Sequence, residues 1–180
     1  MAHSANRPVE ASGALILGID PGLRVTGYGL VAHSGNTLEA VEYGCFTVDP
    51  RLPLPERLAT LFGCLQEVIA RHSPSEVAVE QPFVAANAHS ALAIGEARAL
   101  AVLAAGLAGL PVEQYSPAEV KRAVTGYGRG PKEQVQEMVR LQLGLREVPQ
   151  PFDAADALAV ALCHANHTRS RLLVERSATQ

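Results

Sequence analysis

The stretch from Leu15 to Leu30, LILGIDPGLRVTGYGL, decides the fold of this chain. It opens with a short apolar run that ends at Asp20, and Pro21-Gly22 then breaks the chain. Such a run, bounded by turn residues, is typical of a buried strand, and the residues from Thr26 onward predict a second one. A carboxylate beside a buried strand is costly unless a partner compensates it. Asp20 therefore either opens a turn by hydrogen bonding its own backbone, or it is a metal-binding or phosphate-facing carboxylate held on a rigid strand.

Three further carboxylates lie at the ends of predicted strands or helices. Glu80 ends the apolar stretch VAVE, and Asp153 and Asp156 lie three residues apart where a late helix begins. Residues three apart share a helix face, so the pair alone also fits a variant of a capping box favoured by the helix dipole. Four unpaired carboxylates in one place would repel each other. Together with Asp20, these acids therefore predict a site for divalent cations.

Length and composition indicate a single globular domain. The chain has 180 residues, of which 48% are hydrophobic. Its longest apolar run, from Ala99 to Val112, is too short to span a bilayer, so no membrane association is expected. Cys45, Cys64 and Cys163 show no CxxC spacing, which fits free, mostly buried thiols in a reducing cytoplasm. The pattern Cys163-His164-x-x-His167 is incomplete for zinc.

Charge is distributed unevenly. The formal net charge is −3, yet residues 115–146 carry six basic and three acidic side chains, between the second and third acid sites. That segment is either an ordinary solvated helix pair or a surface for nucleic acid. Lys121 and Lys132, both in this segment, are the only lysines beside 13 arginines. Lysine carries a compact charge that can approach a phosphate closely.

The order of predicted elements favours an α/β fold with a five-stranded mixed sheet flanked by helices. Three strands joined by hairpin-type turns come first and pair antiparallel, and strands alternating with helices follow. The predicted strands are Leu15–Asp20, Thr26–Ala32, Leu38–Val48, Val77–Glu80 and Pro111–Tyr115. The predicted helices are Pro55 to about His72, Asn87–Leu107, Pro117–Val124 behind a Ser116 cap, Lys132–Leu143, and Asp153 to about His167. Residues 14–168 are expected to form one domain, between a disordered extension over residues 1–13 and a flexible tail over residues 169–180.

Several motifs in this order resemble the RuvC-type Holliday junction resolvases, a family of crossover junction endodeoxyribonucleases. They are GIDPGLRVTGYG, VEQPF, NAHSALAIGEAR and DAADALAVALCHA, and the likeness covers nearly all of residues 14–168. The resemblance implies the ribonuclease H-like fold. It also implies an endonuclease that resolves four-way DNA junctions in recombination and repair by paired symmetric nicks. Two-metal-ion hydrolysis would leave 5′-phosphate and 3′-hydroxyl ends.

The resemblance assigns roles to individual residues. Asp20, Glu80, Asp153 and Asp156 match the family's catalytic carboxylates and would hold two Mg²⁺ ions per active site, with Mn²⁺ expected to substitute. Relatives can carry His at the Asp153 position, so Asp153 could act as a general base as well as a ligand. Lys121 would contact phosphate and Lys132 would lie near the scissile bond, as a catalytic and DNA-binding residue.

Three more residues are predicted to bind DNA. Phe83 matches an aromatic that stacks on an unpaired base at the junction centre, although core packing is the usual fate of Phe. Pro82 stiffens the segment before it. Arg122 and Arg129 lie in the basic segment and are predicted to contact DNA as well.

The resemblance also implies partners and a location. The chain would form a homodimer through helix Asn87–Leu107, bind four-way junction DNA, and work with the RuvA–RuvB branch migration complex at the bacterial nucleoid, in the cytoplasm. Three alternatives remain: a ribonuclease H-like nuclease acting on RNA or RNA–DNA hybrids, an actin-like ATPase, and a non-enzymatic junction binder. The ATPase fold needs two lobes and a longer chain, and a mere binder should have lost some of the acids.

Overall fold

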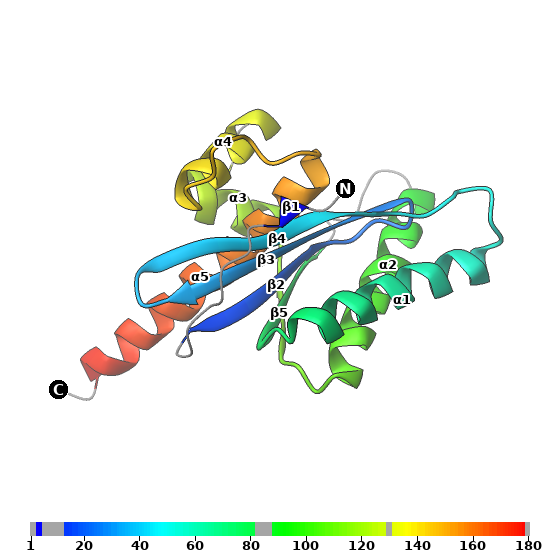
Figure 1. The fold of residues 1–180 in the computed structure, drawn as a ribbon. Helices are drawn as coiled ribbons and strands as arrows, with labels where there is room; N and C mark the ends of the chain where they lie inside the picture. The colour runs from blue at the N-terminus through cyan, green and yellow to red at the C-terminus, as the bar shows by residue number, and fades with distance from the viewer. Residues whose placement is uncertain (1–2, 5–12, 82–87, 129–130, 179–180) are drawn as a thin grey trace.

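The computed structural model describes residues 3–4, 13–81, 88–128 and 131–178 (Figure 1). The strands are β1 (His3–Ser4), β2 (Ala14–Asp20), β3 (Val25–Ser34), β4 (Thr37–Thr47), β5 (Glu76–Glu80) and β6 (Val112–Tyr115). The helices are α1 (Leu54–His72), α2 (Ala88–Leu107), α3 (Pro117–Thr125), α4 (Lys132–Gln142) and α5 (Phe152–Ala178). No helix in these described ranges is long and apolar enough to cross a membrane.

The sheet has the strand order β1-β4-β3-β2-β5-β6. β2, β3 and β4 pair antiparallel, whereas β5 and β6 run parallel to β2. The predicted five-stranded mixed sheet is therefore confirmed. The two residues of β1 add a short sixth strand on β4, within the segment that was expected to be disordered.

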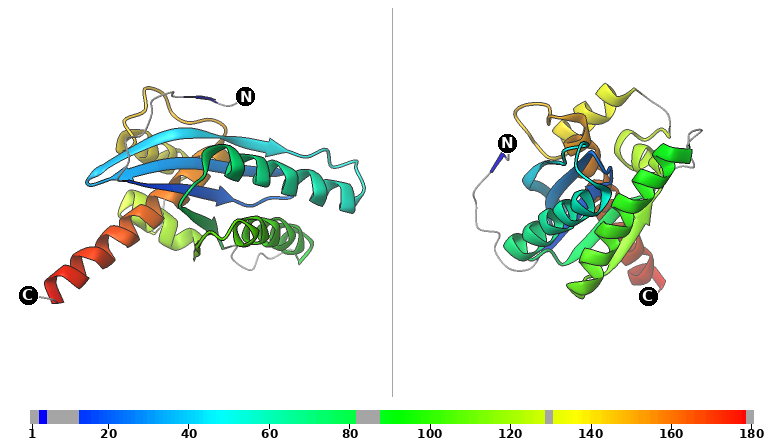
Figure 2. Two further views of the ribbon diagram at one scale, coloured as in Figure 1. Left: turned by 60° about the horizontal axis from the view of Figure 1, so that its bottom comes forward. Right: turned by 90° about the vertical axis from the view of Figure 1, so that its right-hand side faces the viewer.

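Helices cover both faces of the sheet (Figure 1, Figure 2). Side chains alternate between faces along a strand. Leu17, Ile19 and Leu30 thus pack with α1 and α2, whereas Ile16 and Val31 pack with α3, α4 and α5. This two-layer core places each chain segment that carries an acid at a fixed position on the sheet.

Glycines let α5 lie unusually close to the sheet. A Cβ at Gly18 would overlap the Ala157 carbonyl oxygen, and one at Gly27 would overlap the Asp153 carbonyl oxygen. A Cβ at Gly29 would likewise overlap the side chain of Leu158. Because these glycines face α5, the helix backbone sits directly on β2 and β3.

The predicted helix starts agree with the structure, but the end of the last helix was predicted wrongly. The capping box at Ser116 is present, with the Ser116 hydroxyl accepting from the Glu119 amide and the Glu119 carboxylate accepting from the Ser116 amide. α5, however, continues to Ala178 rather than ending near His167. Residues 169–178, assigned above to a flexible tail, are therefore helical, and this half of α5 projects from the body of the molecule (Figure 1).

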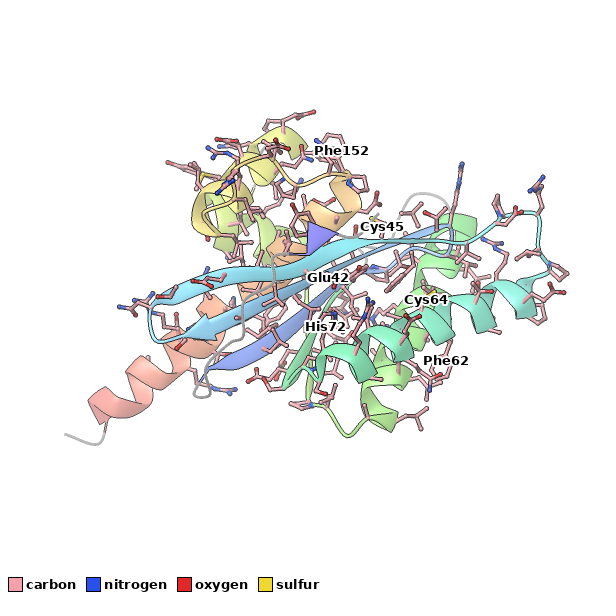
Figure 3. The ribbon with its side chains drawn as sticks, viewed as in Figure 1. Glu42, Cys45, Phe62, Cys64, His72 and Phe152 are labelled. Atoms are coloured by element: carbon pink, nitrogen blue, oxygen red, sulfur yellow. The ribbon has the colours of Figure 1, made fainter. Side chains whose placement is uncertain are left out.

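One buried acid on the α1 side of the sheet was not anticipated from the sequence. Glu42 on β4 is only 7% exposed. Its carboxylate accepts a hydrogen bond from the Tyr28 hydroxyl at 2.9 Å and lies 3.2 Å from Nε2 of His72, at the end of α1 (Figure 3). The guanidinium of Arg71 lies 3.7 Å away. This cluster ties α1 to β3 and β4. All three cysteines are free, and only Cys163 is fully buried.

Candidate active site

Two parallel neighbouring strands bring Asp20 and Glu80 together. β2 and β5 are in register, with Gly18 beside Ala78 and Ile19 beside Val79. Asp20 and Glu80 are the next residues, at the carboxyl ends of their strands. Ligand sites of parallel sheets lie at this edge. Because side chains alternate along a strand, the side chains of both acids lie on the face of the sheet that α5 covers.

The start of α5 adds the other two acids. Gly27 is the strand partner of Asp20 on β3, and it carries the backbone of Asp153 directly above it. Asp153 and Asp156 lie on the same face of α5, in its first turns. The four predicted acids thus meet at one edge of the sheet, although they come from three separate parts of the chain.

Burial and mutual repulsion keep this acid cluster partly protonated. Burial is the largest cause that raises the pKa of Asp20 to about 9, and the charges of Glu80, Asp156 and Asp153 add to it. The hydrogen bond between the two side chains also raises the pKa of Asp20 and lowers that of Glu80. Burial likewise raises the pKa of Glu80 and of Asp156. Because a carboxylate must be deprotonated to bind a cation, metal binding at these acids would release this proton.

Lys132 at the start of α4 lies against this cluster. Its Nζ is 3.3 Å from Oδ2 of Asp156 and 6.0 Å from the ring centroid of Phe152, the first residue of α5. Phe152 is labelled in Figure 3. The charge of Asp156 is the main cause that raises the pKa of Lys132, so the ammonium stays charged. Its side chain is 63% exposed, against 22% for Asp156. An exposed, charged lysine can therefore turn toward a phosphate that enters the site.

Of the other four residues predicted to bind DNA, the structure describes two. Lys121 on α3 is half-buried, and its positive charge lowers the pKa values of Glu80 and Asp156, so it lies near the acids. Arg122 is exposed on the same helix. Phe83 and Arg129 lie outside the described residues.

The four acids provide the oxygen ligands that a divalent cation such as Mg²⁺ prefers. Among residues 13–81, 88–128 and 131–178, no three His, Cys, Asp or Glu side chains are arranged as a ready-made metal site. Mg²⁺ does not need one, since it keeps several waters and is usually held by one or two carboxylates plus substrate phosphates. The four carboxylates at this sheet edge offer such ligands, and the charge of Lys132 partly offsets theirs.

The incomplete zinc pattern has a structural explanation. His164 is 4% exposed, and its Nδ1 lies 2.7 Å from the Tyr115 hydroxyl. Its Nε2 contacts the carboxylate of Glu76. Both ring nitrogens are thus used within the protein, where His164 joins α5 to β5 and β6 beside an open cavity of about 410 Å³.

Some parts of the site were missed from the sequence. The close approach of α5 to Gly18, Gly27 and Gly29 was not predicted, although the alternate spacing of Gly27 and Gly29 along β3 was a usable signal for close helix packing. Phe152 gave no signal, because its contact with Lys132 depends on the placement of α4 against α5.

Comparisons with known proteins agree with this geometry. The family described as "Crossover junction endodeoxyribonuclease RuvC" matches residues 16–164. The chain belongs to the RuvC family. The RuvC of Pelotomaculum thermopropionicum is 53% identical over 153 residues, which are 85% of this chain and 93% of that one. The RuvC of Desulfitobacterium hafniense (strain DSM 10664 / DCB-2) is 49% identical over 152 residues, 84% and 92% of the two chains.

The fold agrees with a solved RuvC structure as well. The T. thermophilus RuvC in complex with Holliday junction substrate superimposes with a TM-score of 0.83 at 39% identity, covering 87% of this chain and 96% of that one. The ribonuclease H-like fold predicted from the sequence is thereby confirmed. As a RuvC crossover junction endodeoxyribonuclease, the chain is a DNA-binding nuclease of recombination and repair, and membership of this family implies dependence on a divalent metal ion.

Proposed function

We propose that Asp20, Glu80, Asp153 and Asp156 form the cleavage centre of this Holliday junction resolvase and hold two Mg²⁺ ions, for which Mn²⁺ can substitute. The convergence of four half-buried acids at one sheet edge carries the proposal. Two such ions, about 4 Å apart, would stabilise the attacking and the leaving oxygen of an in-line displacement. The overall reaction adds one water across a phosphodiester and leaves 5′-phosphate and 3′-hydroxyl ends.

The chain's own residues would do three things in this reaction. Asp153, at the exposed start of α5, can take the proton of the attacking water as a general base. Lys132 leaves Asp156 and places its charge beside the reacting phosphate, where charge develops in the transition state. Close packing of α5 on β2 holds the acids in fixed positions, so that their side chains need to move little when DNA binds.

DNA would be held mainly by the basic segment. Lys121 and Arg122 on α3 are proposed to contact phosphates, which supply affinity without sequence preference. Arg129 is proposed to extend this surface. Phe83, which follows the Glu80 strand, is proposed to stack on an unpaired base at the junction centre.

The working unit is proposed to be a homodimer joined through α2. Leu92, Leu103 and Leu107 are 62%, 50% and 68% exposed on this helix, while alanines on its other side are buried against the sheet. An exposed apolar stripe of this kind marks a contact surface. The T. thermophilus relative was solved with junction DNA. We also propose that the dimer cooperates with the RuvA–RuvB complex on nucleoid DNA in the bacterial cytoplasm.

The proposal is tested by side-by-side cleavage of a mobile four-way junction, a plain duplex and an RNA–DNA hybrid, with and without Mg²⁺. We expect paired cuts in the junction only, and only with the metal. Preferred cleavage of the hybrid would favour the alternative of a nuclease for RNA-containing duplexes.

Asp20→Asn should abolish junction cleavage while binding persists, because the change removes a ligand charge but barely alters shape. Near wild-type cutting by this variant would refute the metal assignment.

A further inference from the structure

Tyr127 is an aromatic side chain that belongs neither to the hydrophobic core nor to the proposed cleavage centre. It is 73% exposed, more than any other large apolar side chain among the described residues. Within the described part of the chain, no residue hydrogen bonds to its hydroxyl. A large aromatic surface that water covers in the free protein is a candidate for contact with a partner.

The fold places Tyr127 at the same sheet edge as the acids. Tyr115 at the end of β6 is the strand partner of Glu80, and its carbonyl accepts from the Gln81 amide at 2.7 Å. α3 begins two residues later, and the loop after α3 folds back over this start. A Cβ at Gly128 would lie only 3.8 Å from the Ala118 carbonyl oxygen. Tyr127, next to Gly128, is thereby held close to the strand end that carries Glu80.

The backbone around Tyr127 is also fixed. Thr125, the last residue of α3, accepts a hydrogen bond from the Tyr127 amide at 3.2 Å. Its hydroxyl lies 2.7 Å from the Tyr127 carbonyl oxygen and 2.8 Å from that of Lys121. Gly126 takes a left-handed conformation with φ 77° that closes α3. The ring is therefore presented from an anchored turn, which reduces the entropy lost when it binds.

Basic side chains stand on both sides of this turn. Lys121 precedes it on α3, and Lys132, whose Nζ is 3.3 Å from Asp156, follows it on α4. Lys132 is the fifth residue after Tyr127, so the two Cα atoms are at most about 18 Å apart even in an extended chain. A DNA strand whose phosphate reaches the acids would therefore have nucleotides near the turn that carries the ring.

We propose that Tyr127 is a DNA contact that stacks on a nucleotide base next to the cleaved phosphodiester. Aromatic rings among basic side chains are the usual means of holding an unstacked base, because every base has a π-face. The ring would position the strand entering the cleavage centre, while Lys121 neutralises its phosphates. This proposal rests on the assignment of the acids as the cleavage centre.

Junction binding in EDTA tests the proposal without involving the metal. Tyr127→Ala should weaken binding by about 5- to 150-fold, the range expected when one base–aromatic stack is lost. Tyr127→Phe should keep wild-type affinity, since the ring alone stacks. Tyr127→Leu keeps apolar bulk but has no aromatic face, so it should behave like Tyr127→Ala. In a junction with 2-aminopurine near the cleavage point, wild type and Tyr127→Phe should quench the fluorescence more than the other two variants.

A matched control comes from the far end of α4. Leu141 is 55% exposed, and Leu141→Ala should leave binding and quenching unchanged. All variants should melt at the wild-type temperature, because Tyr127 and Leu141 are both largely exposed. Wild-type affinity of Tyr127→Ala, or full rescue by Tyr127→Leu, would overturn the proposal. Neither result would contradict the assignment of the acids as the cleavage centre, because that assignment is tested separately by the cleavage activity of Asp20→Asn.

Discussion

At the residue scale, the Asp20–Glu80 pair links metal binding to stability. The unfolded chain loses the Asp20 proton near pH 4, whereas the folded, metal-free protein keeps it up to about pH 9. The folded state thus binds more protons in this window, and its free energy of unfolding falls as pH rises. Binding of Mg²⁺ at the proposed site would replace the proton and remove the repulsion.

Asp20→Asn should therefore stabilise the metal-free protein while abolishing cleavage. In EDTA at pH 8 we expect its melting temperature to exceed that of wild type, by about 2–4 °C for each 1 kcal/mol of repulsion removed. The two proteins should converge toward pH 4. Mg²⁺ should raise the wild-type melting temperature at pH 8 more than at pH 5, and that of Asp20→Asn little. A lower melting temperature for Asp20→Asn in EDTA at pH 8 would contradict this account.

The two lysines are predicted to separate binding from catalysis. Lys132→Ala should lower the single-turnover cleavage rate on the order of 100-fold with little loss of junction affinity, because its charge acts on the transition state. Lys121→Ala should mainly weaken binding and reduce the slope of log K against log salt by about 0.9, the value for one phosphate contact. Titrations at several salt concentrations and quenched-flow cleavage measure both effects. Equal affinity losses with unchanged rates in both variants would count against separate roles.

The four acids that the structure brings together could be singled out from the sequence, because each lies at the end of an apolar run or at the start of a helix. Asp20 and Glu80 end apolar runs, and Asp153 and Asp156 open a helix. The geometry between them could not be predicted in this way. The contact of Lys132 with Asp156 and Phe152 depends on how α4 packs on α5, which is a long-range property.

At the scale of elements, close packing of α5 on β2 and β3 is what sets the spacing of the acids. Gly27→Ala would push a methyl group into the Asp153 backbone. We expect a loss of about 1–3 kcal/mol in the free energy of unfolding and a fall in cleavage of more than about tenfold, because a 1 Å misplacement of reacting groups can cost about 100-fold. Thermal melting and junction cleavage check both effects.

The control for this change lies on α1. Gly63 is exposed, and no atom lies within 4 Å of a Cβ built there. Gly63→Ala should raise the free energy of unfolding by about 0.5–1 kcal/mol through helix propensity and leave cleavage unchanged. If Gly27→Ala cuts as well as Gly63→Ala, the glycines do not position the acids.

Element boundaries were predicted well where a stop signal exists and poorly where none does. Gly126 and Gly144 have the left-handed conformations typical of helix ends, and both were usable signals. After His167 the chain has neither glycine nor proline, but its apolar spacing no longer fits a core face. The helix continues anyway, because the hydrogen-bonded backbone of α5 extends beyond the packed part without needing a buried side.

At the scale of the whole molecule, the proposed dimer contact through α2 would set how two active sites are arranged. Its exposed stripe of Leu92, Leu103 and Leu107 lies on the side away from the sheet. A two-fold contact through one such stripe joins identical surfaces, and a four-way junction has a near two-fold axis of its own. Sedimentation should therefore show roughly 38 kDa, twice the chain mass of 19.0 kDa. Leu103→Asp, with a charge at the centre of the stripe, should shift the protein to 19.0 kDa, whereas Leu141→Asp on α4 should not.

A mixed dimer of wild-type and Asp20→Asn chains tests whether the dimer is the functional unit. Each subunit would place its own four acids on one of two opposing strands, so the mixed dimer keeps one working centre. It should bind the junction as tightly as wild type, nick one strand, and leave the junction unresolved. Cleavage of a supercoiled plasmid with an extruded cruciform separates the outcomes, because one nick gives open circles whereas paired nicks give linear DNA. Linear product from mixed dimers, or paired cuts by a chain that sediments as a monomer, would rule out the arrangement.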